Sequence, residues 1–174
     1  LSSGSESNLE NALRSSAGSV TLEVLNVAEE RATGVVADFR PDVVFHLAAQ
    51  INVTLSVEDP IKDAQINVIG LLRVLEGARF GDARKVVFTS SGAIYGDVDE
   101  SLLPLDERTP RRPLSPYGVT KLAGATYLDA YQALHGLSGT PLALANVDGP
   151  RQDPHGEAGV VAIFARRLLA ERTC

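Results

Sequence analysis

Lys85-Val-Val-Phe-Thr-Ser90 is the stretch that decides the fold class, because it is a short, β-branched apolar run that predicts a strand. A second run, Asp42-Val-Val-Phe-His-Leu-Ala-Ala49, is apolar almost throughout, which is typical of a parallel strand covered on both faces. Between the two, Pro60 stands where a helix would begin, and apolar residues then recur close to every 3.6 positions. Strand, helix and strand in this order predict a parallel sheet with helical crossovers.

The same alternation continues on both sides of these runs. Further strands are expected at residues 19–25 and 141–146, and further helices at residues 28–40, 115–135 and 159–171. The elements together predict an α/β fold with a doubly wound parallel sheet, whose ligands bind at the carboxyl ends of the strands. The loop at residues 96–114 is a further candidate, since so long an unstructured loop is uncommon in a compact domain unless it has a function.

The composition is that of an ordinary globular protein. Of the 174 residues, 44% are hydrophobic and 22% are charged, which excludes a disordered chain. The formal net charge of −6 disfavours non-specific binding to nucleic acid. No run approaches the roughly 18 apolar residues of a membrane span, so no membrane partner is expected. The single cysteine, Cys174, allows no internal disulfide, and we therefore expect a cytoplasmic location.

The strongest chemical signal is Ser115-Pro-Tyr-Gly-Val-Thr-Lys121. Tyr117 and Lys121 are four residues apart at the start of an expected helix, so their side chains share one face. The pKa of a phenol is about 10. A nearby ammonium group favours the phenolate, which can then take a proton from a sugar or alcohol hydroxyl. For the pair alone, the alternative is a chance spacing on a solvated helix.

Hydroxyl groups stand at the end of the strand expected at residues 85–90. Thr89, Ser90 and Ser91 precede Gly92, in a place where a hydroxyl can hydrogen-bond a reacting oxygen and pass on its proton. Taken alone, the segment could equally be a turn at a strand end, where Ser and Gly are common.

Several motifs then occur together in one order along the chain. They are His46-Leu-Ala-Ala-Gln50, Asn67-Val-Ile-Gly70, the Thr-Ser-Ser segment from Thr89, Glu107-x-x-Pro-x-x-Pro-x-Ser-Pro-Tyr117-x-x-x-Lys121, and Asn146-Val-Asp-Gly-Pro-Arg-Gln152. In this combination the chain resembles the extended short-chain dehydrogenases that act on nucleotide sugars, and most of all the UDP-glucose 4-epimerases of actinobacteria. The resemblance covers nearly the whole chain. It implies a Rossmann-type fold and NAD-dependent epimerisation at C4, between UDP-glucose and UDP-galactose, through a 4-keto intermediate.

The resemblance also implies roles for single residues. Ser91, Tyr117 and Lys121 would be the catalytic trio, with Tyr117 as the base for the sugar 4-hydroxyl and Lys121 holding the nicotinamide ribose. The residues that would line the NAD cofactor are Asn26, Leu47, Ala48, Ala49, Asn67, Thr89, Tyr117, Lys121 and Leu144. The residues that would bind the nucleotide-sugar substrate are Ser91, Tyr117, Asn146, Gly159 and Val160. The last two open an expected helix, whose N-terminus suits a diphosphate.

Some positions depart from the family pattern. Asn26 stands where an Asp usually meets the adenine. The Gly-rich turn and the first strand of the sheet would lie before Leu1, and the chain contains no Met. We therefore expect an internal piece in which residues 1–174 form a partial NAD-binding domain, with substrate-contacting segments from about residue 146 onward. Such a piece would be poorly active by itself.

One local feature separates chemistries within the family. Dehydratases and decarboxylases carry a carboxylate just after the catalytic hydroxyl, whereas this chain has Gly92 and Ala93, which favours an epimerase. The alternatives are an epimerase for UDP-N-acetylhexosamines or UDP-glucuronate, a dehydratase for a UDP- or dTDP-sugar, or a non-catalytic dinucleotide-binding module. The helices from Asn67 and Tyr117 could pair with a second copy to form a homodimer, as in related epimerases.

The remaining polar residues receive simpler interpretations. Asp153, His155 and Glu157 alternate in a Pro-Gly loop, where solvation is a better explanation than a metal ion, so no metal is expected. His46 is interpreted as a hydrogen-bonded histidine of the core. The arginines of the long loop, Arg108, Arg111 and Arg112, are expected to face solvent.

Overall fold

The computed structural model describes residues 5–15, 19–152 and 159–170. The chain divides into two compact units, one formed by residues 26–145 and the other by residues 1–25 together with 146–174.

The larger unit alternates helices and strands. In chain order its elements are α2 (Arg31–Phe39), β1 (Val43–His46), α3 (Val53–Glu58), α4 (Pro60–Ala64), the π-helical turn η2 (Gln65–Ile69), α5 (Gly70–Phe80), β2 (Lys85–Thr89), the short turns η3 (Gly92–Ile94) and η4 (Glu100–Leu102), α6 (Pro116–His135) and β3 (Ser138–Leu142). The smaller unit contains η1 (Glu6–Leu9), α1 (Glu10–Ser15) and α7 (Val160–Leu169).

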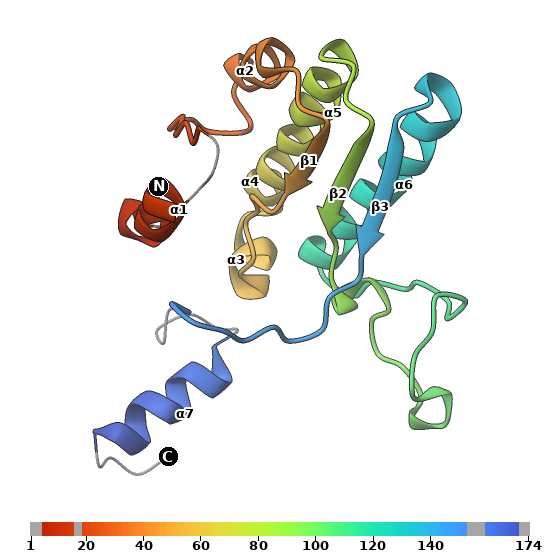
Figure 1. The fold of residues 1–174 in the computed structure, drawn as a ribbon. Coiled ribbons are helices and arrows are strands. Elements are labelled where there is room, and N and C mark those ends of the chain that lie inside the picture. Colours follow the sequence, from red (N-terminus) through yellow and green to blue (C-terminus); the bar gives the residue numbers. More distant parts are fainter. Residues whose placement is uncertain (1–4, 16–18, 153–158, 171–174) are drawn as a thin grey trace. The chain divides into compact units, whose positions relative to one another are not determined.

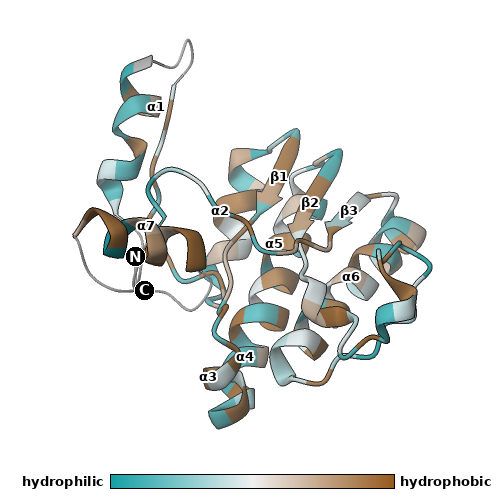
Figure 2. Cartoon of the chain, turned by 90° about the horizontal axis from the view of Figure 1, so that it is seen from below, coloured by the Kyte–Doolittle hydropathy of each residue, from teal (hydrophilic) through white to brown (hydrophobic). Residues whose placement is uncertain are grey.

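The three strands of the larger unit form a parallel sheet in the order β1-β2-β3. Phe45 is opposite Val87, and Val87 is opposite Thr140. Because each strand follows its neighbour in the sequence, a helix must return the chain, and α5 and α6 do so on the same face of the sheet (Figures 1 and 2). The predicted α/β class and parallel sheet are confirmed.

The core lies between this face and the two crossover helices. Val86 and Phe88 of β2 point toward Leu71 and Leu75 of α5 and Leu128 of α6, and these side chains are buried together. Helix α6 approaches closely because Gly124 has no side chain: a Cβ there would stand 2.6 Å from the Phe88 ring. Burial of such a cluster supplies the main driving force for folding the unit.

Helix α6 has strong signals at both ends. Ser115 caps its N-terminus by accepting a hydrogen bond from the backbone N–H of Gly118 at 3.1 Å, and Pro116 occupies the first turn. Gly136 ends the helix in the left-handed conformation with a φ of 71°. The cap fixes where the helix begins and so places Tyr117 in its first turn.

The prediction of a strand at residues 19–25 is wrong. These residues form no ladder with any strand that the structure describes, and Val20, Leu22 and Val24 are exposed. A β-branched segment becomes a strand only where a neighbour pairs with its backbone, and this segment belongs to the smaller unit, whose described residues contain no strand.

Two other expectations need correction. The third strand was expected at residues 141–146 but spans Ser138–Leu142, because β2 ends at Thr89 and Leu142 is its partner. The run 42–49 was expected to be covered on both faces. Phe45 is 68% exposed and Leu47 63%, because helices α5 and α6 pack on the opposite face of the sheet (Figure 2).

Among the described residues, no helix is long and apolar enough to cross a membrane.

Candidate functional site

The hydroxyl side chains at the carboxyl end of β2, Thr89, Ser90 and Ser91, lie near the first turn of α6. Ser91 directly precedes η3, and its hydroxyl accepts a hydrogen bond from the backbone N–H of Ala93 at 3.2 Å. The Ser91 hydroxyl also interacts with the phenol of Tyr117, whose pKa it lowers. Two residues that are 26 positions apart in the sequence are thus brought together by the parallel crossover.

Lys121 lies one turn further along α6 and is almost completely buried, with 2% of its surface exposed. Its Nζ donates a 2.8 Å hydrogen bond to the carbonyl oxygen of Thr89. Nζ also lies 5.0 Å from the ring centre of Phe88 and 5.8 Å from that of Tyr117. Burial lowers the pKa of Lys121 to about 8, and the charge of Asp63 opposes that shift. The trio of Ser91, Tyr117 and Lys121 is therefore assembled at the carboxyl end of β2.

The electrostatics of Tyr117 differ from the expectation. Burial raises the pKa of this phenol, the hydrogen bond with Ser91 lowers it, and the charge of Asp63 raises it slightly further. The pKa of the phenol is thus raised, not lowered as expected, in this structure. Lys121 instead directs its hydrogen bond to the Thr89 carbonyl.

A buried polar cluster lies behind the trio and consists of Gln50, Asp63, Asn67 and Thr120. The carboxylate of Asp63 accepts hydrogen bonds from Gln50 Nε2 at 2.8 Å, from Asn67 Nδ2 at 3.0 Å and from Thr120 Oγ1 at 2.8 Å. Asn67 also exchanges two hydrogen bonds with the backbone of Gln50, at 2.8 and 3.0 Å. The cluster therefore joins the loop after β1, the α4–η2 segment and the first turn of α6.

Sequence reasoning identified Asn67 but missed the other three members of this cluster. The one available signal was the spacing of Asp63 and Asn67, which are four residues apart and so share a helix face. The π-helical turn around Asn67 is a second mark of function, because such turns are frequent at functional sites. It cannot be recognised from a sequence that reads as regular helix.

His46 is buried as expected. The prediction that its side chain is hydrogen-bonded is wrong for the ring nitrogen Nε2. This nitrogen has no hydrogen-bond partner among the described residues. The ring stacks on Phe88 at 6.0 Å. Burial, and next the charge of Lys121, lower the pKa of His46 to about 4, so the imidazole is neutral at neutral pH.

The residues expected to line NAD gather at the carboxyl edge of the sheet. Leu47, Ala48 and Ala49 follow β1, and the first two are exposed. Thr89 ends β2, and its hydroxyl donates to the His46 carbonyl oxygen at 3.2 Å. Leu144 follows β3, and its carbonyl oxygen accepts a 2.7 Å hydrogen bond from the N–H of Gly92.

Asn26 lies apart from these residues in the sequence and precedes α2. Its Oδ1 accepts a 3.0 Å hydrogen bond from the backbone N–H of Ala28. The side chain therefore stabilises the turn into α2 in this structure, and its expected contact with the adenine stays a prediction.

The expected substrate residues beyond the trio belong to the smaller unit. Asn146 is exposed in an extended segment, Gly159 precedes α7, and Val160 is the first residue of that helix. Asp153, His155 and Glu157 lie outside the described residues. Within the described part of the chain, no group of three His, Cys, Asp or Glu side chains could hold a metal ion.

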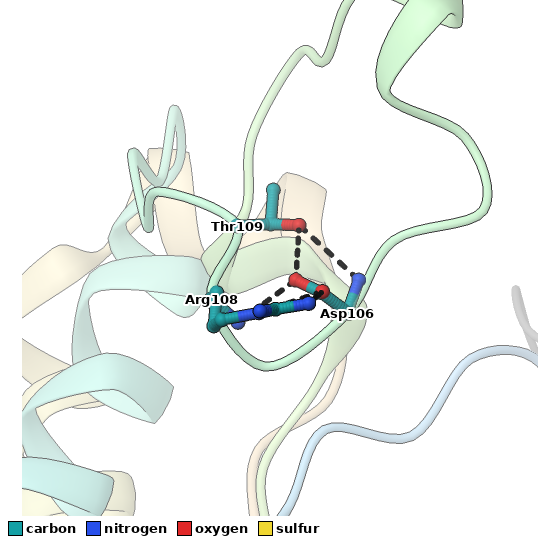
Figure 3. A network of polar contacts seen from close by, with 3 residues as sticks. All are labelled: Asp106, Arg108 and Thr109. Atoms are coloured by element: carbon teal, nitrogen blue, oxygen red, sulfur yellow. Dashed lines mark hydrogen bonds and ion pairs between the residues drawn. The ribbon is translucent and has the colours of Figure 1, made fainter.

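The long loop is ordered by its own side chains. Asp106 accepts hydrogen bonds from the guanidinium of Arg108 at 2.9 and 3.1 Å, and Thr109 is hydrogen-bonded to the same residue (Figure 3). Arg108 faces solvent, as expected. Arg111 and Arg112 are exposed as well, and Arg111 lines a cavity of about 480 Å³ that also touches Ser90 and Gly92.

Known proteins are similar to this chain in sequence and in fold. The chain is 49% identical over 174 residues to a UDP-glucose 4-epimerase of Mycolicibacterium smegmatis, covering 99% of the chain and 54% of that protein. It superimposes on the UDP-glucose 4-epimerase of Thermotoga maritima, solved with UDP-glucose, with a TM-score of 0.88, 40% identity and coverage of 99% and 54%. For the UDP-glucose 4-epimerase of Thermus thermophilus, solved with NAD, the TM-score is 0.88, the identity 41% and the coverage 100% and 54%.

These likenesses confirm the predicted Rossmann-type architecture and the recognised family. The chain spans about half the length of the relatives that it matches. A family model described as the NAD dependent epimerase/dehydratase family matches residues 2–174. The chain belongs to this family.

Proposed function

We propose that the whole protein containing this chain epimerises a UDP-sugar at C4, between UDP-glucose and UDP-galactose, with NAD as its cofactor. The observation that carries the proposal is the convergence of Ser91, Tyr117 and the buried Lys121, in which the Ser91 hydroxyl lowers the pKa of the Tyr117 phenol. A base beside a hydroxyl in this way suits removal of a proton from an alcohol. The relatives named UDP-glucose 4-epimerase support the choice of substrate.

The residues present fit an NAD cofactor. Lys121 has three N–H donors and makes one described hydrogen bond, to Thr89, so donors are left for the hydroxyls of a ribose. Ala48 and Ala49 carry small side chains after β1 and leave that backbone open to a flat ligand. Bound NAD would supply the hydride acceptor and donor at C4.

Tyr117 and Ser91 then each have a definite task at the sugar O4. In its ionised form Tyr117 takes the proton from the sugar O4 as C4 is oxidised to the ketone. Ser91 hydrogen-bonds the same oxygen and holds it in line with the phenol. After the keto-sugar turns over, Tyr117 returns the proton to O4 on the opposite configuration. One base is therefore sufficient for both directions of the reaction.

The surroundings of Ser91 argue against the related elimination chemistry. A dehydratase needs an acid next to the catalytic hydroxyl, and η3 offers Gly92 and Ala93 there. The N–H of Gly92 is bound to the Leu144 carbonyl oxygen at 2.7 Å, which holds this backbone in place. The observation favours epimerisation over loss of water.

Substrate contacts outside the trio are proposed for the smaller unit. Asn146 would contact the diphosphate. Gly159 and Val160 open α7, and the free N–H groups of a helix N-terminus suit an anion such as the diphosphate of a UDP-sugar.

We also propose that the whole protein is a homodimer through its helices. On α6, exposed Val119, Tyr127 and Leu134 follow a helical period, and Ile69 of η2, on the helix from Asn67, is exposed as well. Helix α6 packs against η2. Their outer apolar side chains form a surface of the kind that a second copy covers.

The proposal is tested with UDP-galactose deuterated at C4. The whole protein, supplied with NAD, should form UDP-glucose that keeps the deuterium at C4, because the hydrogen removed from this carbon returns to it. A 4-keto-6-deoxy product from UDP-glucose would indicate a dehydratase. Turnover of UDP-N-acetylgalactosamine or UDP-glucuronate alone would indicate one of the other epimerases, and no turnover of any sugar a non-catalytic module.

A further inference from the structure

Asp63 is a buried carboxylate that the proposed reaction does not use. It is 1% exposed, and no ion pair to it is described within residues 5–15, 19–152 and 159–170. A carboxylate in this position is costly unless donors satisfy it. Gln50, Asn67 and Thr120 supply three hydrogen bonds of 2.8 to 3.0 Å. So dense a set of donors indicates that the position is built for an ionised group.

The hydroxyl of Thr120 has two acceptors within reach and one proton to give. Oδ2 of Asp63 lies 2.8 Å away, and the backbone carbonyl oxygen of Tyr117 lies 2.9 Å away. The carboxylate is the stronger acceptor because it is charged. Without it, the hydroxyl would turn to the carbonyl of Tyr117, and such contacts between a Thr and its own helix bend helices.

We propose that Asp63 is a positioning residue for Tyr117: by holding the hydroxyl of Thr120, it keeps the first turn of α6 straight and aims the phenol at Ser91. The inference rests on the proposed function, since Tyr117 is taken as the base. The geometry that supports it is local. Thr120 lies between Tyr117 and Lys121 on one turn of α6, and Asp63 is the residue of α4 that contacts it.

The same carboxylate also restrains the cofactor side of the site. Its other oxygen accepts from Gln50 Nε2, and Gln50 directly follows the loop expected to line NAD. An amide in place of the carboxylate would offer one accepting oxygen to three donors and would direct N–H groups at its neighbours. Asp63→Asn should therefore release Thr120 while changing the side-chain volume little.

The test compares five variants of the whole protein at saturating NAD. Asp63→Asn, Thr120→Val and the double variant remove the contact. Thr120→Ser keeps the hydroxyl, and Asp59→Asn makes the same charge change at an exposed cap of the same helix, where Asn caps as well as Asp. The readouts are kcat and KM for UDP-galactose, with the melting temperature of each variant.

The expected result separates turnover from binding. Asp63→Asn and Thr120→Val should each lower kcat about tenfold, since misplacement of a reacting group costs this much or more, with KM for UDP-galactose unchanged. The double variant should be no slower than Asp63→Asn. Thr120→Ser and Asp59→Asn should keep the wild-type kcat.

Three results would overturn the inference. The first is a wild-type kcat in both single variants. The second is a double variant whose fold-loss of kcat equals the product of the losses in the two single variants. Such independent effects would mean that the two residues share no contact. If Asp63→Asn does not fold, the comparison of Thr120→Val with Thr120→Ser takes its place. Equal kcat in these two variants is the third result. Wild-type protein without epimerase activity would instead refute the proposed function, and the inference with it.

Discussion

Gly118 lies so close to Ala93 that a Cβ on Gly118 would stand 2.7 Å from the carbonyl oxygen of Ala93 and 2.9 Å from the Cβ of Pro113. Gly118 follows Tyr117, and Ala93 lies two residues after Ser91. The missing side chain therefore allows α6 to begin directly against η3, which brings Tyr117 next to Ser91.

We expect Gly118→Ala to disturb the site through this contact. Added volume at a packed position costs about 1–3 kcal/mol, and a displaced Tyr117 should lower turnover by about tenfold or more. Unfolding by urea and the rate of UDP-galactose epimerisation measure the two effects. Gly34→Ala in α2 is the matched control, because nothing lies within 4 Å of the Cβ that it adds. Equal turnover in both variants would contradict the role of the close approach.

His46 should make the free energy of unfolding depend on pH. Its pKa falls from 6.5 to about 4 on folding, so between these values the unfolded chain binds the proton and the folded chain does not. The contribution of His46 to the free energy of unfolding is fully present above pH 6.5. It decreases as the pH falls, and at pH 4 it is lower by about 3 kcal/mol.

His46→Leu removes the titrating ring and keeps a similar volume. The difference in free energy of unfolding between wild type and variant, measured by urea from pH 4 to 7, should change by about 3 kcal/mol across this window. A difference that is independent of pH would show that the imidazole titrates normally in the folded chain.

The dimer surface can be tested with one charge. Leu134 on α6 is 76% exposed, and a carboxylate there would be buried against a second copy without a partner. Leu134→Glu should therefore convert the dimer to a monomer in sedimentation experiments. Phe39→Glu, at a side chain of α2 that is 74% exposed, should leave the assembly intact. A dimer that survives Leu134→Glu would place the interface elsewhere.

The order of the strands and of the longer helices from residue 28 onward was predictable because each has its own periodicity and its own stop signals, whereas the short helix α3 was not expected. The pairing of Ser91 with Tyr117 was predictable as well, since the ends of parallel strands and the helices that follow meet at one edge. Asp63 was not. A carboxylate between Lys62 and Ala64 reads as surface, and it is buried only because Gln50, Asn67 and Thr120 come together from separate segments.

The strand expected at residues 19–25 illustrates the opposite limit. Apolar Val20, Leu22 and Val24 alternate with polar residues, which is a local criterion for a strand. Strand formation depends on a partner for the backbone, and that information is not contained in the segment itself.

The most direct test of the account is the rate of UDP-galactose epimerisation by Tyr117→Phe in the whole protein. The change removes only the phenol hydroxyl, which is the group that interacts with Ser91. Tyr131→Phe is the matched control, since it removes a hydroxyl from the same helix that donates to Glu76 Oε1 at 2.7 Å. Loss of the base should lower kcat by about 10²–10⁴-fold with the melting temperature preserved, and the control should keep its turnover. Wild-type turnover in Tyr117→Phe would contradict the assignment of Tyr117 as the base.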